Sequence, residues 1–144
     1  IPLDEGANKF IKRAFDGEDP LVVWGDGTPV RDFVHARDVA RGMMFALEQC
    51  PLYPINLGSG KGYTVKEIVD IIVSNMEKKP RIVWDTSKPA GDKKRLMDIT
   101  RAKTLGWQPE ISLEAGIKEV MEWYQKNKDL ALKRYNVFTE KKFF

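Results

Sequence analysis

The feature that most constrains the fold is the succession of a strand, a glycine turn and a helix within residues 21–40. Leu21–Trp24 is a short apolar run with two β-branched residues, and this pattern predicts a buried strand. The Gly25-Asp26-Gly27 sequence that follows predicts a tight turn. Arg31 comes just past that turn, on an element whose apolar neighbours can anchor it. A guanidinium held in this way can bind a phosphate through two parallel hydrogen bonds, so Arg31 is the first candidate for a functional residue.

Apolar residues at helical spacing, together with turn signals, place the other elements. Helices are predicted over residues 8–16, 36–49, 64–76, 100–105 and 112–124. Strands are predicted over residues 21–24, 32–34, 54–57 and 81–84. Thr64 and Glu67 form a capping box, while Asp38, Thr100 and Ser112 are candidate helix caps. The sequence therefore predicts a small mixed α/β domain with short strands and about five helices.

Length and composition narrow the function classes. The 144 residues fit one domain, which we expect over residues 1–125, with a basic and irregular tail over 126–144. The net charge of +3 is spread along the chain rather than gathered in one block, which disfavours a nucleic-acid partner. Cys50 is the single cysteine, so we expect no internal disulfide and a core or boundary thiol in a reducing compartment. No His, Cys, Asp and Glu cluster has metal-ligand spacing, so no metal is expected.

The apolar runs and the first residues bear on location. No run approaches the roughly 20 residues that a membrane-spanning helix needs, and no signal peptide precedes the first predicted helix. We therefore expect a cytoplasmic protein with no membrane partner. The chain opens at Ile1 as if an amino-terminal half were missing or expressed separately.

Several motifs occur in the order that is found in one enzyme family. They are Gly25-Asp26-Gly27, Arg31-Asp32-Phe33, Asp38-Val39-Ala40, the stretch Ser87–Asp98, Leu105-Gly106-Trp107 and Ile111–Gly116. Over residues 8–127 this ordered set resembles the carboxy-terminal half of the extended short-chain dehydrogenase/reductase family. These enzymes epimerise, dehydrate or reduce nucleotide-activated sugars on NAD or NADP. The second half of the set is most similar to the GDP-L-fucose synthase branch.

The resemblance implies a sugar-nucleotide site on this half of the enzyme. Arg31 matches the arginine that clamps the diphosphate of the nucleotide sugar; a salt bridge with Asp32, Asp38 or a helix carboxylate is the alternative. Lys88, Lys94 and Arg95 lie in the stretch that matches the loop closing over that ligand. A solvated run of charges is the alternative for this loop.

Three further residues are candidates for the same site. Lys12 or Arg13 supplies a basic contact on the first helix, and their adjacent positions do not decide between them. Trp24 could stack on a base or a sugar, although a core position is the more usual place for such a tryptophan. His35 lies at the strand-to-helix junction in the resembled family, so we expect it to be structural. The Gly58–Gly62 stretch lacks both the Walker and the dinucleotide spacing, so we interpret it as a structural turn.

The family's catalytic features are absent from the sequence. No glycine-rich dinucleotide fingerprint is present, and Tyr124 is the only tyrosine that a lysine, Lys128, follows four residues later. Because that pair ends an amphipathic helix with no cofactor fold ahead of it, we interpret the spacing as chance. We therefore expect no catalytic residues and no cofactor bound by this chain. NAD or NADP is implied only for the complete enzyme.

The sequence thus favours a substrate-binding domain that lacks the Rossmann half. The expected ligand is a nucleotide-diphosphate sugar, with a GDP-sugar favoured. The expected partner is the missing Rossmann half, or another chain covering the face left exposed, with a homo-oligomer as a further option. The alternative function is a non-catalytic module for nucleotide-sugar binding or protein association, derived from such an enzyme.

Overall fold

The protein is described here by a computed structural model, which covers residues 6–128. Five helices occur within these residues. They are α1 (Gly6–Phe15), α2 (Ala36–Gln49), α3 (Val65–Ser74), α4 (Thr100–Leu105) and α5 (Leu113–Lys126). The strands are short, and they form two separate small sheets. The mixed α/β class and the approximate helix number predicted from the sequence are therefore confirmed.

The first sheet joins two parallel strands, β1 (Leu21–Trp24) and β4 (Ile82–Asp85), with Trp24 opposite Asp85. The second has the order β3-β2-β5 and contains β2 (Val30–Asp32), β3 (Gly62–Thr64) and β5 (Lys94–Arg95). In this sheet β2 pairs antiparallel with β3 and parallel with β5. The register aligns Arg31 with Arg95 on one side.

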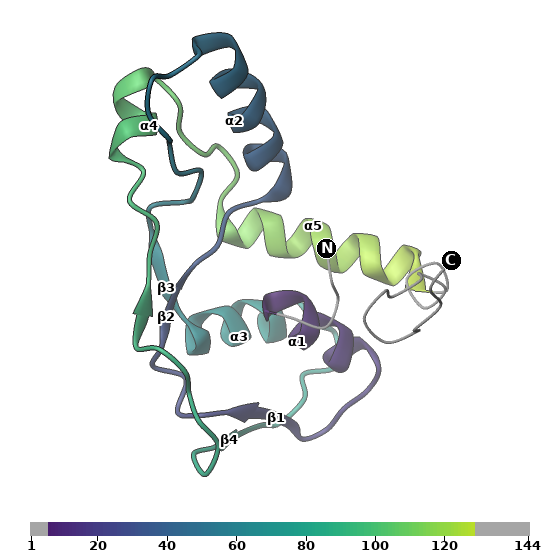
Figure 1. The fold of residues 1–144 in the computed structure, drawn as a ribbon. Coiled ribbons are helices and arrows are strands. Elements are labelled where there is room, and N and C mark those ends of the chain that lie inside the picture. The colour runs from purple at the N-terminus through teal and green to yellow at the C-terminus, as the bar shows by residue number, and fades with distance from the viewer. Residues whose placement is uncertain (1–5, 129–144) are drawn as a thin grey trace, which may run out of the picture.

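The main core lies between α1, α3 and α5, which pack side by side in the middle of the molecule (Figure 1). Each of these helices contributes an apolar stripe, as expected for helices that bury one face. The fully enclosed side chains are Ile11, Ile68, Ile72, Ile117, Met121 and Tyr124. The α3 helix starts at the predicted capping box, in which the Thr64 hydroxyl accepts from the Glu67 amide at 3.1 Å.

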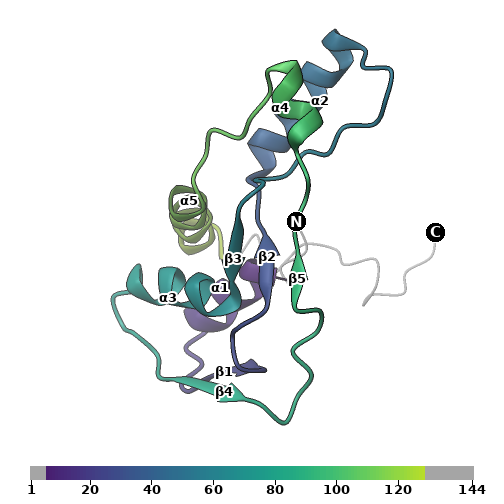
Figure 2. The same ribbon diagram turned by 90° about the vertical axis from the view of Figure 1, so that its left-hand side faces the viewer.

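A second packing centre lies at one end of the molecule, where α2 and α4 lie together, away from the β1–β4 sheet (Figure 2). Trp107 is 2% exposed there. A Cβ added to Gly42 of α2 would lie 2.7 Å from Leu57 and 2.9 Å from Trp107. Only glycine therefore allows these two side chains to approach the helix so closely.

Several local predictions are confirmed. Helix α2 has the predicted bounds, Ala36–Gln49. Strand β1 covers the predicted residues, and β4 is displaced by one residue toward the carboxyl end. Ser112 caps α5 by accepting from the Ala115 amide at 3.2 Å, and Gly106 ends α4 with a positive φ of 103°. These features depend on neighbours in the sequence, which is why local patterns locate them.

Four expectations about local structure are wrong. Residues 54–57 do not form a strand, because within the described chain their contacts with the segment at Asp98–Arg101 are made by the side chains of Asn56 and Arg101 and not by a backbone ladder. His35, not Asp38, is the cap of α2, because the imidazole Nδ1 accepts from the Arg37 amide at 3.2 Å. The amide of Thr100 donates to the Asp98 carboxylate, so Thr100 is the first residue of α4 rather than its cap. Cys50 is exposed at the carboxyl end of α2 rather than in the core.

Two further sequence expectations concern the chain end and the membrane. Most of the expected tail over 126–144 lies outside the described residues, although α5 itself continues to Lys126. Among the helices of the described part, none combines the length and the apolar character that crossing a membrane requires.

Candidate functional site

Arg31 lies in the middle of β2, where its neighbours on both sides are paired strands. Its Nη1 donates to the Val30 carbonyl at 2.9 Å and to the Asp92 carbonyl at 2.7 Å. Within residues 6–128, no carboxylate forms an ion pair with this guanidinium, so the salt bridges considered with Asp32 and Asp38 do not form. The positive charge of Arg31 is thus fixed in position by backbone carbonyls without being neutralised.

The loop between β4 and α4 carries most of the other candidate cations. Lys88, Lys94 and Arg95 are all exposed, and Lys94 and Arg95 make up β5. The Arg95 Nε donates to the Asp92 carboxylate at 2.5 Å, so one acid partly neutralises this loop. The backbone amide of Val30 donates to the Lys93 carbonyl at 2.9 Å and holds the loop against β2. The register therefore places Arg95 opposite Arg31 in the strand pair, whereas Lys94 lies opposite Val30.

Trp24 ends β1 with 63% of its surface exposed, so the expectation that it belongs to the core is wrong. In β1 the side chains of Leu21 and Val23 are buried, and strand alternation sends Trp24 to the opposite face. The turn that follows is packed tightly, since a Cβ on Gly25 would lie 2.8 Å from the Cβ of Ala90. Trp24 is thus exposed, and the residue that follows it, Gly25, lies close to Ala90 of the cation-bearing loop.

Lys12 and Arg13 lie on α1 and are engaged in contacts within the fold. Lys12 pairs with Asp16 at 3.1 Å. Although burial alone would raise the pKa of Asp16, the ammonium groups of Lys128 and Lys12 keep it below its ordinary value. Arg13 pairs with Glu18, lowers the pKa of that carboxyl, and donates to the β1 backbone. Lys12 therefore contacts only its own helix end among the described residues, whereas Arg13 also binds β1. A ligand role for either residue stays a prediction.

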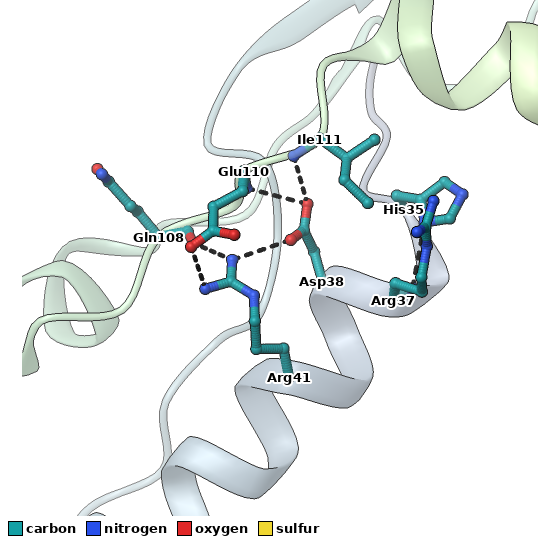
Figure 3. A network of polar contacts seen from close by, with 7 residues as sticks. All are labelled: His35, Arg37, Asp38, Arg41, Gln108, Glu110 and Ile111. Atoms are coloured by element: carbon teal, nitrogen blue, oxygen red, sulfur yellow. Dashed lines mark hydrogen bonds and ion pairs between the residues drawn. The ribbon is translucent and has the colours of Figure 1, made fainter.

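A larger polar network, which the sequence did not reveal, joins α2 to the loop before α5 (Figure 3). Asp38 is 1% exposed, and its carboxylate accepts from the amides of Glu110 at 3.1 Å and Ile111 at 2.9 Å. Arg41 donates to Asp38 at 2.9 Å and to the Gln108 carbonyl at 2.7 Å. The spacing of Asp38 and Arg41 on one helix face was a visible signal, but their loop partners are some 70 residues away. This network holds α2 to the loop before α5.

Comparison with known proteins identifies the family of the chain. Residues 6–120 match the family described as GDP-mannose 4,6 dehydratase. The chain belongs to this family. This agrees with the extended short-chain dehydrogenase/reductase family that the ordered motifs indicated.

Three relatives show what share of their length the chain covers. GDP-L-fucose synthase of Escherichia coli strain K12 is 40% identical over 131 residues, which cover 84% of this chain and 41% of that protein. A UDP-glucose 4-epimerase from Thermotoga maritima, solved with UDP-glucose, has a TM-score of 0.72 at 33% identity, covering 85% and 40%. A GDP-L-fucose synthetase from Naegleria fowleri, bound to NADP, has a TM-score of 0.75 at 27% identity, covering 88% and 40%. The chain thus spans about two fifths of each relative.

The Gly58–Gly62 turn and the Tyr124–Lys128 pair are the two features that could suggest cofactor chemistry, and both have other roles in the structure. The amides of Ser59 and Gly60 donate to the carboxylate of Asp32, so this turn does not present them to a phosphate. Tyr124 is 1% exposed, and burial raises the pKa of its phenol. Lys128, the other member of the spaced pair, binds the Asp16 carboxylate at 2.9 Å. The residues at these positions do not fit a tyrosine that exchanges protons beside a cofactor.

Proposed function

We propose that this chain binds a nucleotide-diphosphate sugar as the substrate-binding part of an NAD(P)-dependent sugar-nucleotide epimerase or reductase. The observation that carries the proposal is Arg31, a positioned guanidinium without an ion-pair partner in the described chain. Arg95 lies opposite it in register, and Lys88 and Lys94 add charge to the same loop. Such a group suits a diphosphate, because a planar guanidinium donates hydrogen bonds to two phosphate oxygens at once.

Trp24 supplies the second element of the proposed site. Its ring is exposed, the next residue, Gly25, lies close to Ala90 of the cationic loop, and the ring offers a flat apolar surface to a sugar or a base. We favour guanosine as the base, since a GDP-L-fucose synthase is among the relatives that share 40% of their aligned residues with this chain. Under this proposal, the nicotinamide cofactor and the proton-transfer residues belong to the part of such enzymes that this chain does not span. The fixed cations then orient the sugar toward that part.

Replacing Arg31 with alanine is expected to weaken GDP binding about 10- to 100-fold, the loss that follows when charge-assisted hydrogen bonds worth roughly 1.5–3 kcal/mol are removed. Isothermal titration of the purified chain with GDP, UDP and dTDP measures this change and ranks the bases. Arg95→Ala is expected to have a smaller effect, because Asp92 already neutralises part of its charge.

Arg81→Ala is the matched control for this measurement. Arg81 is exposed and precedes β4, at the end of the β1–β4 sheet opposite Trp24. The substitution removes the same charge from the chain at a distance from the proposed site, so the affinity for GDP should stay close to that of the original protein. Equal losses in the two variants would show only an effect of net charge, and would contradict a phosphate contact at Arg31.

A specific surface favours protein association as a second function. We define the α2 face as Met43, Met44, Leu47, Leu52 and Tyr53, each of which is at least 59% exposed. The backbone of residues 55–57, next to this face, makes no hydrogen bond to other backbone groups within the described chain. Apolar patches and unpaired backbone of this kind are usual where another polypeptide packs. We propose that the remaining three fifths of such an enzyme, or a second chain, covers this face.

Light scattering after gel filtration tests the role of the α2 face. The chain alone is expected to self-associate at tens of micromolar, because the apolar side chains stay exposed in the monomer. Leu47→Glu combined with Leu52→Glu is expected to return it to a monomer. Val83→Glu, which adds one glutamate at an exposed position on β4, is the control for each single substitution, Leu47→Glu or Leu52→Glu, and should leave association unchanged. A monomer before any substitution would contradict this role.

A further inference from the structure

Asp32 joins three segments that are far apart in the sequence. It ends β2, directly after Arg31. One of its carboxylate oxygens accepts from the Ser59 amide at 2.8 Å and the Ser59 hydroxyl at 2.5 Å. The other accepts from the amides of Gly60 and Met97, both at 3.2 Å. One side chain therefore ties β2 to the glycine turn and to the chain just after β5.

The loop that carries the cations has little else to hold it. Residues 86–98 are all exposed, so apolar burial contributes little to their position. Strand β5 has only two residues. At its amino end the loop is held by the Val30 amide and the Arg31 guanidinium, which bind the carbonyls of Lys93 and Asp92. At its carboxyl end the bond from the Met97 amide to Asp32 extends the β2–β5 pairing by one further contact, and the Asn56 side chain donates to the Asp98 carbonyl at 3.0 Å.

The glycine turn is shaped to admit this carboxylate. A Cβ on Gly58 would lie 2.9 Å from an Asp32 carboxylate oxygen and 2.6 Å from the Cβ of Met97. The close approach of these three segments is thus built into the sequence at Gly58. With four donors around it, the carboxylate is fully occupied and is not available to a ligand.

We infer that Asp32 is a positioning residue that holds the cation-bearing loop in register with Arg31, so that the two can bind one anionic ligand together. Asp32 does not contact the ligand itself. It acts through the Met97 amide, which fixes the carboxyl end of β5 and with it Lys94 and Arg95. The identity of the ligand in this inference rests on the proposed function. The role of Asp32 in holding the loop does not depend on it.

Amide hydrogen exchange and GDP titration on the complete chain test this role. In Asp32→Asn, which keeps the side-chain volume, the Met97 and Gly60 amides lose a charged acceptor and are expected to exchange at least tenfold faster. Affinity for GDP is expected to fall about tenfold, since the loop cations are no longer held beside Arg31. Asp38→Asn is the control, because it weakens a structural carboxylate on α2 and should lower the melting temperature without changing affinity for GDP.

A second variant separates positioning from general stability. Met97→Pro removes the amide that donates to Asp32, together with the Met97 side chain and the freedom of φ there, and leaves the carboxylate bound to Ser59 and Gly60. It is expected to weaken GDP binding as much as Asp32→Asn does. Unchanged Met97 exchange in Asp32→Asn would overturn the inference, as would faster exchange spread evenly over the core amides. If the original chain binds no GDP, the proposed function fails, and the exchange of Met97 still decides whether Asp32 holds the loop.

Discussion

Replacing Asp38 with alanine is expected to lower the free energy of unfolding by about 3 kcal/mol, since it removes a buried ion pair and leaves amide donors without an acceptor. The carboxylate is the acceptor for Glu110 and Ile111 in the loop before α5, and for Arg41 on its own helix. Chemical denaturation followed by circular dichroism measures the loss. Because the network joins α2 to α5, we also expect α2 to lose protection from hydrogen exchange first.

Asp70→Ala is the matched control, because Asp70 is an exposed aspartate on α3 with no ion pair among the described residues. It should change the free energy of unfolding by no more than about 0.5 kcal/mol, as is usual for a surface position. A similar loss of unfolding free energy in both variants would contradict a stabilising role specific to Asp38.

The stability that Asp38 contributes to the fold is expected to depend on pH. Burial would raise the pKa of Asp38, but hydrogen bonds from the Ile111 amide, the Arg41 guanidinium and the Glu110 amide outweigh it and keep this pKa below the ordinary value of 3.8. A carboxyl with a lower pKa in the folded state stabilises the fold above the unfolded pKa. This contribution is lost as the pH falls below about 3.8 and through the folded pKa. The difference in stability between the original chain and Asp38→Asn should shrink over that range.

Replacing Trp107 with alanine is expected to cost about 3 kcal/mol, toward the lower part of the range for deleting a buried aromatic ring. The ring packs against Gly42 and Leu57 and holds α2 to the segment before α5. The cost is moderated because the buried Nε1 has no hydrogen-bond partner among the described residues, so its removal relieves a penalty. Thermal unfolding of the variant measures the loss.

Two companion variants make this prediction specific. Trp24→Ala deletes the same side chain at an exposed position, and should change stability by less than about 1 kcal/mol. Trp107→Phe keeps much of the apolar ring and removes the unpaired donor, so it should cost clearly less than alanine. If Trp24→Ala lost as much stability as Trp107→Ala, burial would not be the cause of the loss predicted for Trp107.

The proposed site illustrates how two adjacent residues of one strand can serve different purposes. Arg31 presents a charge that backbone carbonyls hold in place, and Asp32 organises the chain around it. The loop cations would otherwise be a solvated run of charges, which was the alternative interpretation of the sequence. Their pairing with β2 is what makes a shared anion site physically reasonable.

Local patterns predicted a large part of the fold. Helix α2, strand β1 and the Thr64–Glu67 capping box follow from periodicity and from hydrogen bonds between near neighbours. Residues 54–57 have the composition of a strand and yet do not form one. A strand exists only through bonds to a second segment, and no segment among residues 6–128 forms such a backbone ladder with them.

The sequence by itself determined the family, through motifs whose order and identity carry over residue by residue, and it determined which cations could meet a phosphate. The tertiary structure decided which of those cations are engaged elsewhere, as Arg13 is with Glu18. It also decided that Trp24 is exposed and that Asp38 is buried. The physical reason is that burial and ion pairing depend on contacts between distant segments, while the sequence records directly only what lies within a few residues.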